Sequence, residues 1–235
     1  MRRIWISLNV FFWTFFLGIG SIISIKLSNN KNNFKYYSIK WSEMLIKTSG
    51  VQLEIRGKKN IKDNKNYIFA PNHSSFMDFP VLFVAVNKYL VFVAKKELER
   101  IPIFKSILSI SGSIFVNRDN TNDAIDSLDE LKSDIKNTPR SVVVFPEGTR
   151  SNLNQLKSFK KGAAVLSINT GLPIIPVYIM GSSDWWNTKN FRKNSNKIVI
   201  NFGKPIITEN KQYEDRKNIT NSIKKEIIKL QNNEL

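Results

Sequence analysis

The first fifty residues carry a pattern typical of membrane attachment. After Met1-Arg2-Arg3, the stretch Ile4–Ile25 contains no charged residue, and Phe and Trp side chains crowd its centre. As a helix these 22 residues would run roughly 33 Å, about the thickness of the hydrocarbon core of a bilayer. The stretch is long for a cleaved signal peptide, and no small-x-small site follows it. We therefore expect a membrane-attached helix, and the pattern leaves open whether it spans the bilayer or dips into one leaflet.

A polar break at Ser28–Asn33 precedes a second helical pattern. Apolar and aromatic side chains recur at the spacing of one helix face, at Phe34, Tyr37, Trp41, Met44, Leu45 and Thr48. This face either packs on a protein core or lies at a membrane interface, and its position next to the hydrophobic helix favours the interface. Basic residues far outnumber the single acid up to Lys47, so the positive-inside rule predicts a cell-membrane protein with its polar body on the cytoplasmic side.

From residue 50 onward, apolar runs of strand length alternate with helical stretches. The strand-like runs are Val51–Ile55, Tyr67–Ala70, Tyr89–Ala94, Ser113–Val116, Val142–Phe145, Ile174–Ile179 and Ile198–Phe202. The helical stretches are Pro80–Asn87, Pro102–Ser109, Asn122–Lys136, Gly162–Asn169 and Tyr213–Leu230. Such alternation predicts an α/β sheet with ligands at the carboxyl ends of its strands. We expect residues 1–49 to form the membrane-attached helices and residues 50–235 to form the α/β domain.

Composition narrows the chemistry. The 235 residues suffice for one sizeable α/β domain, and the formal net charge of +17 attracts polyanions such as anionic lipid, nucleic acid or an acidic protein. The chain contains no Cys, which excludes thiol catalysis, disulfides and Cys-ligated zinc. Its single histidine, His73, excludes mechanisms that need two imidazoles, including most zinc sites. We therefore expect no metal ion.

One candidate for acid–base chemistry directly follows an apolar strand, in the segment Ala70–Asp78. Asp78 lies five residues beyond His73, so a helical turn between them can bring the carboxylate back to one imidazole nitrogen. The other nitrogen would then accept a proton. Alternatively, His73 is a structural histidine and Asp78 begins a helix. Ser74 and Ser75 are adjacent to the base, but adjacency does not place a hydroxyl on its free nitrogen, so we expect the substrate to supply the attacking hydroxyl.

Two further strands end on arginine. Gly112–Val116 leads to Arg118, and Val144–Ser151 contains Pro146-Glu147-Gly148-Thr149-Arg150. Arginine at a strand exit can clamp a phosphate bidentately, and glycine allows close approach of the backbone to a ligand. Each of these residues alone also fits a surface charge or a turn.

Together the clusters NHSSFMD, GSIFVNR, FPEGTRS and LPIIPV resemble, in order and spacing, the motifs of the glycerolipid acyltransferase family. The best-known members of that family are lysophosphatidic acid acyltransferases. AKKEL at Ala94–Leu98 and FKKG at Phe159–Gly162 are also similar to family strings. The resemblance covers most of the chain, from about Val51 to Phe202. It implies a mixed, largely parallel sheet flanked by helices, and an N-terminal helix pair similar to the membrane-docking element of bacterial members.

The resemblance also implies the reaction. His73 would deprotonate the free hydroxyl of lysophosphatidic acid, which attacks an acyl thioester of acyl carrier protein or coenzyme A and gives phosphatidic acid, while Asp78 orients the imidazole. No cofactor is implied. By the same resemblance, other residues of the motifs bind the phosphate of the acceptor or lie near the acyl group: Arg118, Glu147, Gly148, Thr149, Arg150 and Pro173. Lys95 and Lys160 are further candidates for contacts with the phosphate.

Several alternatives stay open at the level of sequence. The acceptor is either lysophosphatidic acid, another lysolipid or glycerol 3-phosphate. A membrane-tethered esterase would use Ser74 or Ser75 as nucleophile. A non-enzymatic protein would only bind membranes through its basic residues. The lysines are dispersed and resemble no nucleic-acid module, so we expect no nucleic-acid partner. Gly181–Asn196, which contains Trp185 and Trp186, is either a second membrane-touching loop or a surface turn with packed aromatic residues.

Overall fold

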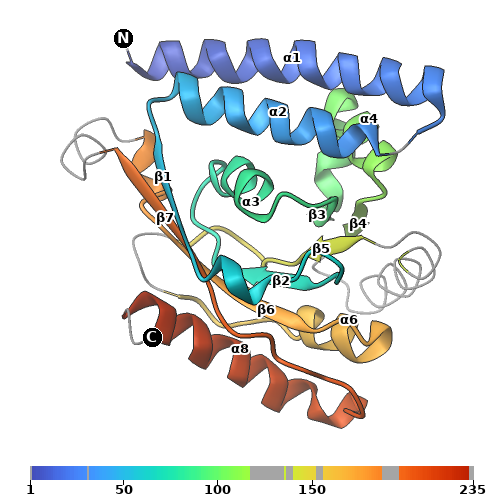
Figure 1. Ribbon diagram of the computed structural model, residues 1–235, viewed down its shortest axis with the longest axis vertical. Coiled ribbons are helices and arrows are strands. Elements are labelled where there is room, and N and C mark those ends of the chain that lie inside the picture. The colour runs from blue at the N-terminus through green and yellow to red at the C-terminus, as the bar shows by residue number, and fades with distance from the viewer. Residues whose placement is uncertain are drawn as a thin grey trace.

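The fold is a seven-stranded sheet between two layers of helices (Figure 1). The computed structural model describes residues 2–30, 32–116, 135, 140–151, 156–186 and 196–232. The strands are β1 Gln52–Arg56, β2 Ile68–Pro71, β3 Leu90–Lys95, β4 Ile114–Val116, β5 Ser141–Val143, β6 Ile174–Met180 and β7 Lys197–Phe202. The helices with settled bounds are α1 Arg2–Ser28, α2 Asn33–Thr48, α3 Asp78–Val86, α4 Pro102–Ser111, α6 Gly162–Thr170 and α8 Arg216–Gln231.

The strand order is β1-β7-β6-β2-β5-β3-β4, and β6 with β7 is the one antiparallel pair in this sheet. The mixed, largely parallel sheet is confirmed. β2 and β5 are neighbours, but the chain leaves them toward opposite faces, through α3 after β2 and through α6 after β5. A crevice therefore opens outside their carboxyl ends, which is where α/β sheets bind ligands.

Each face of the sheet has its own apolar core. Along β2, Phe69 packs with α1, α2 and α3 on one face, whereas Ile68 and Ala70 pack with α6 and α8 on the other. This alternation follows from the two-residue period of a strand. The two layers are visible in Figure 1, with α1 in blue on one side of the sheet and α8 in red on the other. The first two helices share a core with the α/β domain, since Ile6 and Phe34 belong to it.

The amphipathic face of α2 lies on protein. Phe34 and Leu45 are buried, and the ring of Trp41 meets the edges of Phe76 and Phe83 at centroid distances of 6.0 and 6.5 Å. Of the two interpretations of this face, the interfacial one that we favoured is wrong. The reason is that α3 and α1 already cover it, so it has no lipid to meet.

The predicted strands all occur, within a few residues of their expected ends. Short 3-10 turns were not predicted: Lys58–Asn60, Lys96–Arg100, Ser183–Trp186 and Tyr213–Asp215. The last of these forms the start of the stretch that we predicted as one helix. The predicted helix Asn122–Lys136 lies outside the described residues except at Ile135.

Gly57 and Lys58, which follow β1, contact β7 and the end of α3. Gly57 has φ +67°, and a Cβ there would overlap the carbonyl oxygen of Phe202 on β7. The next residue, Lys58, donates from Nζ to the carbonyl oxygens of Ala85 and Val86 at the end of α3. Burial lowers the pKa of the Lys58 ammonium. These contacts hold one end of the helix whose other end is Asp78.

We predict that Gly57→Ala destabilises the protein by roughly 2–4 kcal/mol, because alanine strains the left-handed backbone and also collides with β7. Gly50→Ala is the matched control: its φ is +68°, but nothing lies within 4 Å of an added Cβ. It should cost only about 1 kcal/mol of strain. Urea unfolding in detergent measures both, and equal losses for the two variants would contradict the close approach at Gly57.

Candidate functional site

The predicted chemistry gathers at the crevice outside β2 and β5. We call residues 72–77, which follow β2, the His73 loop, and residues 144–151, which follow β5, the Glu147 loop. The two loops are joined directly, because the backbone N–H and the hydroxyl of Ser151 donate to the carbonyl oxygen of His73 at 2.8 and 3.0 Å. The crevice therefore places the imidazole beside the segment that carries Arg150.

The Asp78 carboxylate holds the imidazole and the loop together. Its Oδ2 lies 2.8 Å from His73 Nδ1 and accepts the backbone N–H groups of Ser74 and Ser75 at 2.8 and 2.9 Å. Its side chain is 0% exposed. Oδ2 accepts from the two backbone N–H groups, and with Nδ1 donating to it as well the imidazole carries its proton on Nδ1. The five-residue spacing thus gives the predicted contact, through the loop that leads into α3.

The imidazole is held between aromatic rings. It stacks on Phe145 with a centroid distance of 4.0 Å, and Phe79 approaches edge-on at 5.7 Å. Only 12% of the His73 side chain is exposed. Its Nε2 has no hydrogen-bond partner among the residues that the structure describes. Nε2 is therefore the nitrogen available to a substrate proton.

The neighbouring serines are engaged elsewhere. The hydroxyl of Ser74 lies 2.8 Å from the hydroxyl of Ser182, and Ser75 Oγ accepts the backbone N–H of Met77 at 3.2 Å. Neither hydroxyl contacts the imidazole in the described part of the chain. This arrangement speaks against a nucleophilic serine.

Asn72 extends the sheet into the His73 loop. Its side-chain amide donates to the carbonyl oxygen of Ile179 at 3.0 Å and accepts that residue's N–H at 2.7 Å, and its own backbone N–H donates to Val177. The Asn72 side-chain amide thus makes the same two hydrogen bonds with Ile179 that a paired strand residue would make. These bonds hold Asn72, the residue before His73, against β6. The sequence reasoning did not single out Asn72 as a site residue.

Glu147 braces two loops. Its carboxylate is 4% exposed, and its two oxygens accept the backbone N–H groups of His73 at 2.9 Å and Lys157 at 3.0 Å. In this geometry Glu147 links His73 to the segment around Lys157. That Glu147 also contacts the acceptor stays a prediction.

Four of the other predicted residues lie close to Glu147 in the chain or in space. Gly148 has φ +69° and turns the chain, and the aliphatic part of Lys160 lies over it, because an added Cβ would be 3.1 Å from that side chain. Thr149 and Arg150 are exposed. The carbonyl oxygen of Arg150 accepts a hydrogen bond from Lys157 Nζ at 2.8 Å.

The remaining predicted residues are scattered. Lys95 ends β3 at the same edge of the sheet and pairs with Glu97 at 2.7 Å. Arg118 lies outside the described residues. Pro173 precedes β6 beside the start of β2, since its carbonyl oxygen accepts the N–H of Ile68 at 3.0 Å. His73 follows the other end of β2, so Pro173 lies away from the imidazole, and its contact with a substrate stays a prediction.

A cavity of ≈ 720 Å³ lies between α1 and the His73 loop. Its lining comes from α1, the His73 loop, the Glu147 loop and the turn after β6: Ser7, Val10, Phe11, Thr14, Phe15, Ser74, Ser75, Phe76, Arg150, Ser183 and Trp185. Trp185 is 3% exposed, so the packed-aromatic alternative for this segment holds at Trp185. The helix predicted as a membrane anchor also forms a wall of the cavity beside the base, which its hydrophobicity alone did not indicate.

The outward side of α1 is apolar. Its large exposed side chains are Ile4, Trp5, Leu8, Phe11, Phe12, Phe15, Phe16, Ile23 and Leu27. Among the described helices, α1 is the one long and apolar enough to cross a membrane, over Ile4–Ser28. An exposed apolar surface of this extent is typical of contact with lipid or with another protein. Within the described residues, no three His, Asp or Glu side chains lie together as metal ligands would.

Comparison with known proteins identifies relatives. The sequence profile of the family described as Acyltransferase matches residues 52–180. A 1-acyl-sn-glycerol-3-phosphate acyltransferase of Borreliella burgdorferi is 33% identical over 184 residues, which are 77% of this chain and 72% of that protein. The protein of the same name from Saccharomyces cerevisiae is 33% identical over 163 residues, 68% of this chain and 54% of its own length. The chain thus spans about half the length of the yeast relative, and likewise 53% of one from Cocos nucifera.

A solved structure shares the fold. The crystal structure of the 1-acyl-sn-glycerophosphate (LPA) acyltransferase from Thermotoga maritima superposes with a TM-score of 0.72 over 98% of both chains, at 24% sequence identity. Both α1–α2 and the sheet therefore lie within the shared architecture.

We predict that substitutions at Glu147 loosen one or both of the segments that its carboxylate binds, the His73 loop and the segment around Lys157. Glu147→Ala removes both acceptors, so backbone amides should exchange with deuterium faster in residues 72–79 and also in 156–162. Glu147→Gln keeps one acceptor and should release one of the two segments, at a cost of roughly 1–3 kcal/mol for the buried N–H left unpaired. Hydrogen exchange followed by mass spectrometry measures this. Glu43→Ala, which removes an exposed carboxylate on α2, is the control. Unchanged exchange at both segments in Glu147→Ala would show that the Glu147 carboxylate does not hold them.

Proposed function

The chain belongs to the acyltransferase family, and on that basis we propose that it transfers an acyl group from a thioester to the free hydroxyl of lysophosphatidic acid, giving phosphatidic acid. The observation that supports this most directly is the imidazole of His73, oriented through Nδ1 by Asp78 with Nε2 left open. The names of the bacterial and yeast relatives support the choice of acceptor.

The reaction proceeds by direct attack. His73 Nε2 removes the proton of the acceptor hydroxyl as its oxygen attacks the thioester carbonyl, and Asp78 stays ionised and stabilises the imidazolium. The tetrahedral intermediate then collapses, the carbon–sulfur bond breaks, and the imidazolium returns its proton to the departing thiolate. The balance needs no oxidant or reductant. That the protein works without a cofactor stays a prediction.

The acceptor phosphate binds at the Glu147 loop. Arg150 lies on the wall of the α1 cavity and presents an exposed guanidinium, which suits a bidentate phosphate contact. Thr149 is exposed beside Arg150, and the Lys160 side chain, which lies over Gly148, adds positive charge to the proposed phosphate site. Arg118 and Lys95 are further phosphate ligands in this proposal.

The acceptor enters from a membrane. Hydrogen bonds from Trp5 to Thr48 and from Trp41 to Thr14 hold α1 against α2, and the exposed apolar side chains of α1 face outward. This packing supports a helix embedded in one leaflet of the cell membrane, with the catalytic domain on the cytoplasmic face. A single-tailed lipid can then reach the α1 cavity with its chain still in hydrocarbon.

We predict that His73→Ala loses acyl transfer to lysophosphatidic acid by at least roughly 10²–10⁴-fold, because general-base catalysis is removed. The assay measures phosphatidic acid formed in vesicles, with both acyl carrier protein and coenzyme A thioesters supplied. Lys65→Ala, an exposed residue near the start of β2, is the control. If the wild type makes no phosphatidic acid with either donor, other lysolipids are the next acceptors. Full activity in a folded His73→Ala would refute the mechanism.

Ser74→Ala separates direct attack from an acyl-enzyme route. Since the Ser74 hydroxyl contacts Ser182 and not the imidazole, we expect the variant to keep its rate within about tenfold, the loss of one hydrogen bond being worth about 1 kcal/mol. The same vesicle assay measures this. A loss comparable to that of His73→Ala, or labelling of Ser74 by a serine-reactive fluorophosphonate, would favour the esterase instead.

A further inference from the structure

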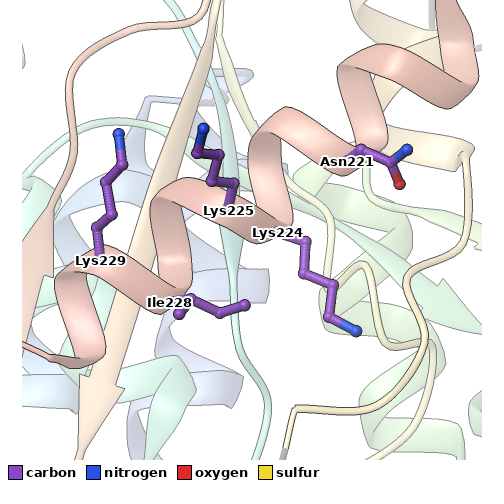
Figure 2. A pocket seen from close by; sticks show the side chains of 5 residues that line it. All are labelled: Asn221, Lys224, Lys225, Ile228 and Lys229. Atoms are coloured by element: carbon purple, nitrogen blue, oxygen red, sulfur yellow. The ribbon is translucent and has the colours of Figure 1, made fainter.

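The outer face of α8 carries a basic surface with an apolar centre. A second cavity, of ≈ 400 Å³, is lined by Asn221, Lys224, Lys225, Ile228 and Lys229, which recur at the spacing of one helix face. Figure 2 shows Lys225 and Lys229 extending to one side of the helix and Lys224 to the other. Ile228 is 40% exposed although the apolar residues on the inner face of α8 are buried. A charged rim around an exposed apolar side chain is typical of a protein-binding site.

This surface reaches the segment 156–161, which the Glu147 side chain binds at Lys157. Lys224 Nζ lies 5.8 Å from the centre of the Phe159 ring, which packs on the α8 side of the sheet. Phe159 stands between Lys157, whose N–H is bound by Glu147, and Lys160, whose side chain lies over Gly148. Positive side chains therefore continue from α8 to the edge of the proposed active site. The segments 156–161 and 216–231 contain one acid, Glu226, which pairs with Lys229.

The position of the surface argues for a partner in solution. α1 packs with the core on one face of the sheet and α8 with the core on the other, as Figure 1 shows. With the apolar side of α1 on a bilayer, α8 faces away from it. Anionic lipid headgroups are then out of reach of Lys224 and Lys225, and a soluble acidic molecule is not.

We propose that this α8 surface is the docking site of an acidic carrier protein that delivers the acyl thioester. The inference rests on the proposed function, because the donor must bring its thioester to Nε2 of His73 while the acceptor occupies the α1 side. Lysines of the rim attract the acidic partner and speed its association, Ile228 supplies an apolar contact, and the carrier's long flexible arm crosses the Glu147 loop.

Steady-state kinetics of the full chain in vesicles tests the proposal with two donors, palmitoyl-acyl carrier protein and palmitoyl-coenzyme A. The variant Lys224→Glu/Lys225→Glu should raise the KM for the carrier-protein donor about tenfold or more. That KM should also change less with salt concentration in the variant than in the wild type, because the attraction between opposite charges is lost. The kcat, and the KM values for palmitoyl-coenzyme A and lysophosphatidic acid, should stay within about twofold. Lys62→Glu/Lys65→Glu, with the same change of charge near the start of β2, should leave every parameter unchanged.

A second variant distinguishes a protein partner from any polyanion. Ile228→Ser removes only the apolar centre, so it should weaken binding of the carrier protein in a titration with the full-length protein and leave binding of free coenzyme A unchanged. Binding of the carrier protein tests the docking site even if the protein shows no acyl transfer. Absence of acyl transfer would refute the proposed function and not the docking site. Equal KM increases for both donors, or weaker attachment of the charge-reversed variant to anionic vesicles, would overturn the α8 assignment, as would wild-type kinetics in both variants.

Discussion

A single buried oxygen, Oδ2 of Asp78, organises the chemistry of the site. The imidazole and two backbone N–H groups converge on it, so the carboxylate shapes the His73 loop and selects the tautomer of the base in one step. Because the Asp78 side chain is fully buried, loss of any of these donors would leave a buried acceptor with fewer hydrogen bonds. The loop geometry and the orientation of the His73 imidazole therefore depend on the same atom.

The crevice is held from three directions by residues that need not touch a substrate. Asn72 fastens the His73 loop to β6, Ser151 binds the carbonyl oxygen of His73, and Glu147 binds its N–H. His73 thus has its backbone fixed on both sides, besides its side chain. Preorganisation of this kind is what the proposed general base needs, because it could then accept a proton without rearrangement of the loop.

The sequence predicts the parts that depend on local periodicity and short spacing. The strands follow from short apolar runs, and the contact between His73 and Asp78 follows from a five-residue interval. What it does not contain is the pairing of distant segments. Glu147 binds residues 74 positions before and 10 after it, and Asn72 binds a residue 107 positions away. For the same reason the motifs did not indicate that Pro173 and His73 lie at opposite ends of β2, because order along the chain does not give the position along a strand.

The arrangement of the layers suits a reaction between substrates from two phases. An acceptor lipid is confined to a bilayer, whereas an acyl thioester carrier is dissolved in water, so one surface cannot serve both. The sheet separates an apolar helix, α1, from a basic one, α8, and its crevice opens at the edge between them. The crossovers from β2 and β5 run to opposite faces, which in the proposed reaction would give each substrate a separate approach to the His73 imidazole. In the same proposal the net charge of +17 would have two roles: the N-terminal basic residues would orient the protein at the membrane, and the C-terminal ones would bind the donor.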